Sequence, residues 1–252
     1  MNFASTFAAL AALAASSGAL AQATVKPDNQ WRAAFTVGFS VASGNTESTL
    51  LNVQADAVRA SETDKLVLFG QQTYGESAEV RTNDLATLGA RYNRDIDPQW
   101  FWFANGEATR NELANLSVRA SVASGIGRHV VKTEATTFDM FGGLGWSYDR
   151  YVDPVFVADA VRERYQRWEP VIGEESTHKL SATTTLRQRL AVFPNATDTG
   201  EFRATFEGGV AVAMTNTLSL NATLSVRYSS DPGVGVKTTD TLFVTGVAYK
   251  LD

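Results

Sequence analysis

The sequence predicts an all-β protein: a single antiparallel transmembrane β-barrel of about 12 strands, with 10 strands as the alternative, preceded by a cleavable signal peptide. Three observations support this prediction. An uncharged apolar segment opens the chain, apolar and polar residues alternate along most of the remainder, and the 252 residues are 44% hydrophobic but only 19% charged. Such a composition is too apolar for a disordered chain. Because cysteine is absent, disulfide scaffolds, thiolate metal sites and cysteine nucleophiles are excluded.

The first 21 residues have the features of an export signal. They carry no charged side chain, residues 7–15 form an apolar core, and Ala19-Leu20-Ala21 matches the small-x-small pattern of a signal-peptidase site. The apolar run is too short to cross a bilayer as a helix, which needs about 20 residues. We therefore predict cleavage between Ala21 and Gln22, a short periplasmic segment at 22–30 and a barrel over 31–252. The alternative is a disordered or helical N-terminus of a cytosolic protein.

The mature chain is dominated by a two-residue alternation that is typical of β-strands. From Trp31 to Val41 every second residue is apolar, and the intervening residues are small or polar. Twelve such segments leave about 19 residues for each strand and its connection, which suits membrane strands of about 9–11 residues better than soluble strands of about 5–6. The expected strand centres are residues 36, 53, 69, 90, 105, 121, 142, 173, 189, 207, 223 and 245.

The polar face is expected to line the lumen and the apolar face to contact lipid. Parity along the strands assigns seven arginines and five carboxylates to the inside, so the charges nearly cancel. Because an unpaired ion in a confined lumen loses solvation, we expect these charges to pair and the lumen to be narrow or occluded. The predicted lumen charges are Arg32, Asp56, Arg91, Glu107, Arg119, Asp139, Arg187, Arg189, Glu201, Arg203, Glu207 and Arg227.

Aromatic residues gather near the expected strand ends, where a membrane barrel places its interfacial girdles. The alternative is a soluble β-barrel or sandwich in which the apolar face forms an inward core. Long strands combined with an export signal favour the membrane barrel. The predicted girdle residues are Trp31, Tyr92, Trp100, Trp102, Trp146, Tyr148, Tyr228 and Tyr249.

With both ends in the periplasm, short connections are expected inside and longer loops outside. The outer loops are expected at 76–84, 151–164, 194–200 and 230–239. In the second of these, Val157, Val161, Tyr165 and Trp168 have helical spacing, which leaves two alternatives, a short surface helix and an irregular loop.

Several segments resemble the YdiY-like family of salt-induced outer-membrane proteins, and together they span nearly all of residues 31–252. The resemblance implies an outer-membrane location, lipid and lipopolysaccharide as surroundings, barrel-insertion machinery as a partner during biogenesis, and a role in envelope or salt stress. It supplies no catalytic residues. Many such barrels end in an aromatic residue that the insertion machinery reads; here either Tyr249 or Leu251 serves, or insertion relies on other features of the strands. The segments are the turn Ser43-Gly44-Asn45-Thr46 with Glu47, then 88–93, 143–151, 173–180 continuing to Gln188 and 193–194, and 228–232 with Asp240.

Four roles remain open from the sequence: a structural barrel braced by its lumen charges, a slow and weakly anion-favouring pore, an acyl hydrolase, and a loop-mediated binding protein. A hydrolase would need a serine activated by histidine, and the candidates are His129, His178 and Ser176. No G-x-S-x-G motif is present. We expect no enzymatic activity.

Partners and cofactors are constrained mainly by charge and composition. The net charge of −5 argues against a nucleic-acid binder, and two histidines cannot form a multi-histidine metal site. We expect no cofactor, no bound metal and a monomer. Loop carboxylates are available to divalent cations or lipopolysaccharide, although they show no calcium-loop pattern. They are Glu76, Glu79, Asp84, Asp153, Asp159 and Asp240.

Overall fold

A computed structural model describes residues 23, 25–42, 48–77, 79–232 and 237–251. The predicted cleavage site at Ala21 and Gln22 and the turn Ser43-Gly44-Asn45-Thr46 lie outside these residues.

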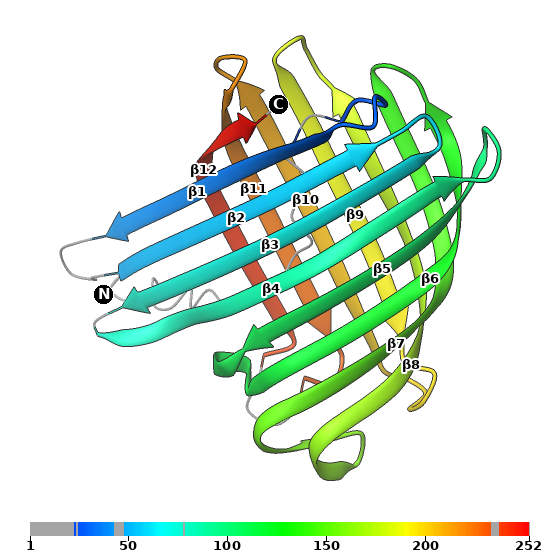
Figure 1. Ribbon diagram of the computed structural model, residues 1–252. Helices are drawn as coiled ribbons and strands as arrows, with labels where there is room; N and C mark the ends of the chain where they lie inside the picture. Colours follow the sequence, from blue (N-terminus) through cyan, green and yellow to red (C-terminus); the bar gives the residue numbers. More distant parts are fainter. Residues whose placement is uncertain (1–22, 24, 43–47, 78, 233–236, 252) are drawn as a thin grey trace, which may run out of the picture.

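The described part of the chain forms a closed barrel of 12 antiparallel strands, in which each strand pairs with the next and β12 pairs with β1 (Figure 1). The predicted fold and strand number are therefore confirmed, and every predicted strand centre falls within a strand. The strands are β1 (Trp31–Ala42), β2 (Ser48–Ala60), β3 (Asp64–Ser77), β4 (Val80–Asp95), β5 (Trp100–Asn111), β6 (Leu116–Lys132), β7 (Thr136–Val157), β8 (Ala160–Lys179), β9 (Thr184–Pro194), β10 (Phe202–Ala213), β11 (Leu218–Ser229) and β12 (Thr239–Leu251).

The helical content is minimal. Within the described ranges the only helix is the 3₁₀ turn η1 (Glu112–Ala114) between β5 and β6. No helix in these ranges has the length and apolarity needed to cross a membrane.

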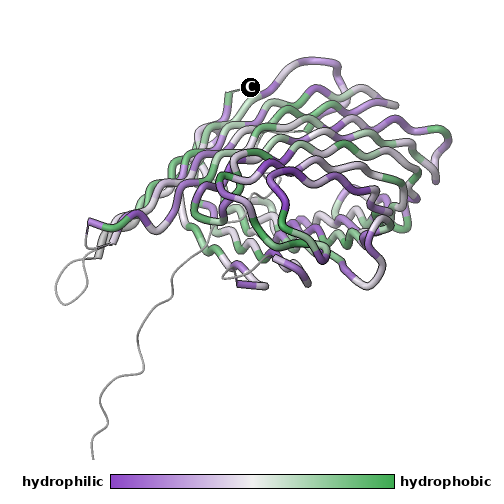
Figure 2. Tube along the Cα trace, turned by 90° about the horizontal axis from the view of Figure 1, so that it is seen from below, coloured by the Kyte–Doolittle hydropathy of each residue, from purple (hydrophilic) through white to green (hydrophobic). Residues whose placement is uncertain are grey.

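The barrel places polar side chains inside and apolar side chains outside. Asn52 and Thr73 are fully buried and joined by a 2.7 Å hydrogen bond, whereas Leu88, Phe39 and Phe243 are each more than 60% exposed. Figure 2 shows the matching alternation of hydrophilic and hydrophobic residues along the strands. A soluble barrel would bury its apolar face, so this arrangement favours an apolar surrounding.

The hairpin of β7 and β8 corrects one prediction. Residues 151–164 form neither a surface helix nor a long loop, because both strands continue until only Ala158 and Asp159 remain between them. Both have positive φ, 48° and 57°, as in the tight turns that join twisted strands. The spacing of Val157, Val161, Tyr165 and Trp168 therefore reflects strand residues on either side of a turn. The expected loop at 76–84 is likewise mostly strand, since β4 begins at Val80.

The first and last strands meet at the shortest pairing in the barrel. β1 and β12 are joined over five residue pairs, from Ala33 with Leu251 to Val37 with Val247. By contrast, β1 and β2 are paired along their full length, from Trp31 with Arg59 to Ala42 with Ser48. We call the β1–β12 pairing the seam.

Of the described residues before β1, Ala23 lies against the inner wall, and Val25 and Lys26 line the lumen, at the end of the barrel where the seam lies, here called the terminal end. Ala23 is buried with Ala34, Val58 and Val67, and its backbone N–H donates to Asp56 at 2.9 Å. Farther along, Arg32 donates two hydrogen bonds to the Asp28 carboxylate. This segment therefore narrows the terminal mouth of the lumen.

Candidate functional site: the lumen

The lumen contains three adjoining spaces of very different size. The terminal vestibule, at the terminal end, has a volume of about 590 Å³. The waist, near the middle, has about 80 Å³, and the far pocket, at the opposite end, has about 130 Å³. Arg91 and Arg189 border both vestibule and waist, while Arg119 and Arg203 border both waist and far pocket. The barrel is therefore widest inside its terminal end and constricted beyond it.

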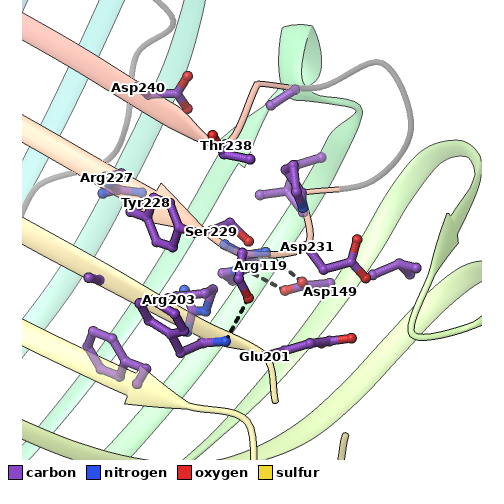
Figure 3. Close-up of a pocket in the computed structure, with 18 of the residues that line it drawn as sticks. Arg119, Asp149, Glu201, Arg203, Arg227, Tyr228, Ser229, Asp231, Thr238 and Asp240 are labelled. Carbon is purple, nitrogen blue, oxygen red and sulfur yellow. Dashed lines mark hydrogen bonds and ion pairs between the residues drawn. The ribbon is translucent and has the colours of Figure 1, made fainter. Parts of the chain in front are cut away.

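A chain of alternating charges runs along the lumen wall from β6 through β7 and β8 to β10, where the waist meets the far pocket; Figure 3 shows three of its members, Arg119, Asp149 and Arg203. Arg119 binds Asp149 through two hydrogen bonds of 2.6 Å, and Arg167 reaches the same carboxylate at 2.9 Å. Arg167 also donates to Glu169 at 2.8 Å, and Arg203 joins Glu169 at 2.6 Å. Asp149 and Glu169 have almost no exposed surface, at 0% and 2%. Each buried charge is thus compensated by a charged hydrogen-bond partner.

We call these five residues, Arg119, Asp149, Arg167, Glu169 and Arg203, the ion chain; the sequence predicts only two of them as lumen residues. Arg119 and Arg203 were assigned to the lumen from parity, but Asp149, Arg167 and Glu169 were missed. These three residues flank the loop expected at 151–164, a region that the structure instead places almost entirely in β7 and β8. The sequence does contain a signal for Asp149: polar and apolar residues continue to alternate along β7, and Ser147 and Asp149 fall on its inward positions.

The other predicted lumen charges occupy distinct places in the structure. Arg91, Glu107, Arg189, Glu207 and Arg227 line the waist. Asp139 and Arg187 line the terminal vestibule, and Glu201, just before β10, lines the far pocket. Arg32 pairs with Asp28, outside the strands, and Asp56 accepts from the Ala23 amide.

Polar atoms without partners remain in the waist. Arg227 Nε and Glu207 Oε2 are buried and have no hydrogen-bond partner among the described residues. Buried polar groups are normally satisfied by protein or ordered water. The waist therefore offers hydrogen-bonding positions to water or to a passing ion.

The far pocket is balanced in charge. Its lining contains five cationic and five anionic side chains. Burial raises the pKa of Glu201, an effect that a hydrogen bond from Asn195 opposes. Figure 3 shows Arg119, Asp149, Arg203, Arg227 and Asp240 arranged around this pocket.

The terminal vestibule is strongly basic. Seven cationic side chains line it, against two carboxylates, Asp139 and Glu175. Both carboxylates have partners, because Asp139 lies 2.7 Å from His129 and Glu175 lies 2.5 Å from Arg189. The cations are Lys26, Lys65, Arg91, Lys179, Arg187, Arg189 and Lys250.

An aromatic cluster forms part of the vestibule wall. Phe101, Phe103 and Phe141 pack together with Val171 and Ala191 on the inside of the barrel. The rings of Phe103 and Phe141 meet edge to face with centroids 5.5 Å apart, and the Arg189 guanidinium lies 4.5 Å from the Phe141 centroid. The vestibule therefore combines positive charge with apolar surface.

Two of these rings, Phe101 and Phe141, each depend on a glycine across the strand pair. Phe101 is paired with Gly127, and Phe141 with Gly173. A Cβ at Gly127 would lie 2.1 Å from Phe101 Cζ, and one at Gly173 would lie 2.4 Å from Phe141 Cζ. These glycines leave room for a ring to lie close to the neighbouring backbone.

The predicted girdle residues fall into two groups at the two ends of the barrel. Trp31, Tyr92, Trp100, Trp102 and Tyr249 lie near strand ends at the terminal end. Trp146, Tyr148 and Tyr228 lie toward the opposite end, where Trp146 stacks with Tyr148 at 6.3 Å and is paired in register with Trp168. Trp168, whose spacing from Val161 and Tyr165 is also compatible with a helix, is 55% exposed in β8 and extends this second group.

The hydrolase candidates do not form a nucleophile and base. His129 lies between Asp139 and Asp95, with the second contact at 3.2 Å. His178 Nδ1 is 3.3 Å from the Thr136 hydroxyl, and Ser176 Oγ is buried without a hydrogen-bond partner in the described structure. Ser176 is therefore not activated by His178.

The loop carboxylates are dispersed around the barrel. Asp84 pairs with Arg81 at 2.8 Å, and Asp240 lines the far pocket. No group of three or more metal-ligating side chains occurs among the described residues.

Comparisons with known proteins agree with this architecture. Residues 35–251 match the model of a family described as "Protein of unknown function, DUF481". The solved NanC porin is similar over 86% of this chain and 100% of its own, with 12% identity and a TM-score of 0.51. The COG4313 outer-membrane channel from Pseudomonas putida F1 is similar over 94% and 99%, with 12% identity and a TM-score of 0.50. At this identity the likeness concerns the fold alone. No curated protein matches the chain.

Proposed function

The chain belongs to the DUF481 family, which is the YdiY-like family that its motifs indicate, and we propose that it is an outer-membrane barrel that passes small anions slowly through a narrow lumen. The membrane location is supported by the apolar outer face, by the two aromatic groups and by the export signal expected at residues 1–21. Outer-membrane lipid and lipopolysaccharide would surround it, and the barrel-insertion machinery would assemble it, as a monomer.

The observation that carries the proposal is the charge asymmetry of the lumen. The vestibule is lined by seven cations and two carboxylates, and the waist by five arginines and three glutamates. Only the far pocket is neutral. A confined space with excess positive charge concentrates anions and repels cations. The waist volume of about 80 Å³ limits the path to small ions.

Planar bilayer recording tests the proposal directly. We expect small single-channel currents and a reversal potential that reports anion preference in a KCl gradient. The double variant K65Q/R187Q should reduce that preference, because it removes two vestibule cations. The control R128Q lies on β6 and is outward, over the Trp100 ring, so it should leave the reversal potential unchanged. A flat trace over many insertions would contradict the proposal.

A structural barrel without conduction is the second candidate. The ion chain through Arg119, Asp149 and Arg167 supports it, because these groups satisfy one another along three neighbouring strands of the wall. A flat trace combined with strong destabilisation when Asp149 is replaced would favour this alternative. The salt- or envelope-stress role implied by the family resemblance is compatible with either candidate, and growth of a deletion strain at high salt tests it.

A further inference from the structure

We propose that the terminal vestibule is a binding site for a small organic carboxylate with an apolar or aromatic body. This inference goes beyond the proposed conduction of small anions, because it concerns a molecule that binds in the vestibule and need not pass the waist. Three features of the vestibule carry it: its volume, its uncompensated charge and its apolar wall.

The volume suits an organic molecule. At about 590 Å³, the vestibule falls within the range of roughly 300–1,000 Å³ of ligand pockets. An inorganic anion would occupy only a small part of that space. A molecule the size of a monocyclic carboxylate would fit together with water.

The charge suits an anion. Lys65, Arg91 and Arg187 point into the vestibule from β3, β4 and β9, and none has a carboxylate within ion-pair distance in the described part of the chain. The two carboxylates present are engaged by His129 and Arg189. Arginine presents paired N–H donors that match the two oxygens of a carboxylate. An incoming carboxylate would therefore supply the missing negative charge.

The wall suits an apolar body. Phe101, Phe103 and Phe141 line the same space as the cations, and Val67 lies nearby. A carboxylate with a ring can therefore place its charge among the arginines and its ring along this wall. A simple inorganic anion would use only the first of these contacts.

The far pocket provides a contrast within the same lumen. It has only about 130 Å³, and its five cations are matched by five anionic side chains. Organic anions should therefore bind at the terminal end, which in the proposed topology faces the periplasm.

Isothermal titration of the folded barrel in detergent tests the site with four probes: benzoate, acetate, sulfate and benzylammonium. We expect benzoate to bind at least tenfold more tightly than acetate or sulfate, and benzylammonium not to bind. R187Q should weaken benzoate binding at least fivefold, R187K should restore much of it, and R128Q should have no effect. Heat-modifiable gel mobility verifies that each variant is folded.

Each outcome has a defined meaning. The proposed site is overturned if benzoate and benzylammonium bind equally well. It is also overturned if benzoate binds R187Q as tightly as it binds the unmodified protein. Equal binding of sulfate, acetate and benzoate overturns the organic ligand class. Titration does not depend on conduction, so the two proposals can fail separately. Benzoate binding without conduction would contradict the proposed pore and support the binding site. Conduction without benzoate binding would support the pore and contradict the binding site.

Discussion

Asp149 is the residue on which the ion chain at the waist depends. Its carboxylate accepts hydrogen bonds from Arg119 and Arg167 and has no exposed surface. Replacing it with asparagine leaves the Arg119 guanidinium without its counter-charge, and the buried Arg167 guanidinium with Glu169 as its one remaining carboxylate partner. We expect D149N to lower the free energy of unfolding by about 3–5 kcal/mol, measured by urea titration of the folded barrel in detergent.

The control for this variant is the Asp84 carboxylate, which pairs with Arg81 at 2.8 Å near the barrel rim. Arg81 is about half exposed, so water screens the pair. D84N should cost less than about 1 kcal/mol. Equal effects of D149N and D84N would show that the ion chain contributes no special stability.

Asp28 gives the segment before β1 a dependence on pH. Hydrogen bonds from Arg32 hold the pKa of Asp28 well below its usual range. The carboxylate therefore stabilises the folded state above its unfolded pKa of about 3.9, and this contribution is lost as the pH falls below that value. The protein should be more stable than D28N at pH 6, and the difference should shrink as the pH approaches 3 in urea titrations. A difference that is constant over this range would contradict the assignment.

At the scale of elements, the phenylalanine–glycine pairs set the shape of the vestibule wall. A methyl group at Gly127 would collide with the Phe101 ring, whereas one at Gly142 would meet its nearest atom at 3.7 Å. We expect G127A to destabilise the barrel by about 1–3 kcal/mol and G142A to cost clearly less, measured by urea titration. In the F101A background the cost of G127A should largely disappear. Additive effects of the two changes would exclude the steric explanation.

The β7–β8 turn contains a residue whose backbone conformation lowers the stability of the hairpin. Ala158 has a φ of 48°, a conformation that costs a residue with a Cβ about 1–2 kcal/mol relative to glycine. A158G should therefore slow proteolysis of this hairpin. The neighbouring variant A160G removes a side chain within β8, so it should have the opposite effect. Faster cleavage of A158G would contradict this explanation.

The elements were predictable from sequence because strand alternation is a local signal. Trp31 to Val41 shows its two faces without any knowledge of partners, and β7 likewise continues through Ser147 and Asp149. The turn at Ala158 and Asp159 was not predictable, because neither residue is a glycine or asparagine that would mark it. The sequence alone therefore predicts a loop where β7 and β8 in fact continue.

At the scale of the whole molecule, parity assigns a side to each residue but no partner. It places Arg119 and Arg203 inside, yet their contacts with Asp149 and Glu169 depend on how the strands are staggered around the barrel. The same limit applies to the vestibule. Lys65, Arg91 and Arg187 are far apart in sequence and border one space only after the barrel has closed.

Closure of the barrel also means that the order of paired strands is cyclic. Since β1 and β12 lie side by side at the seam, a short linker between their ends, combined with a cut in the β7–β8 turn, would keep every strand beside its present neighbours. The seam has only five residue pairs, so the new covalent link would reinforce the barrel where its wall is most weakly joined. In principle the ring could be opened between any two neighbouring strands, and β1 and β12 are the two that share the shortest pairing.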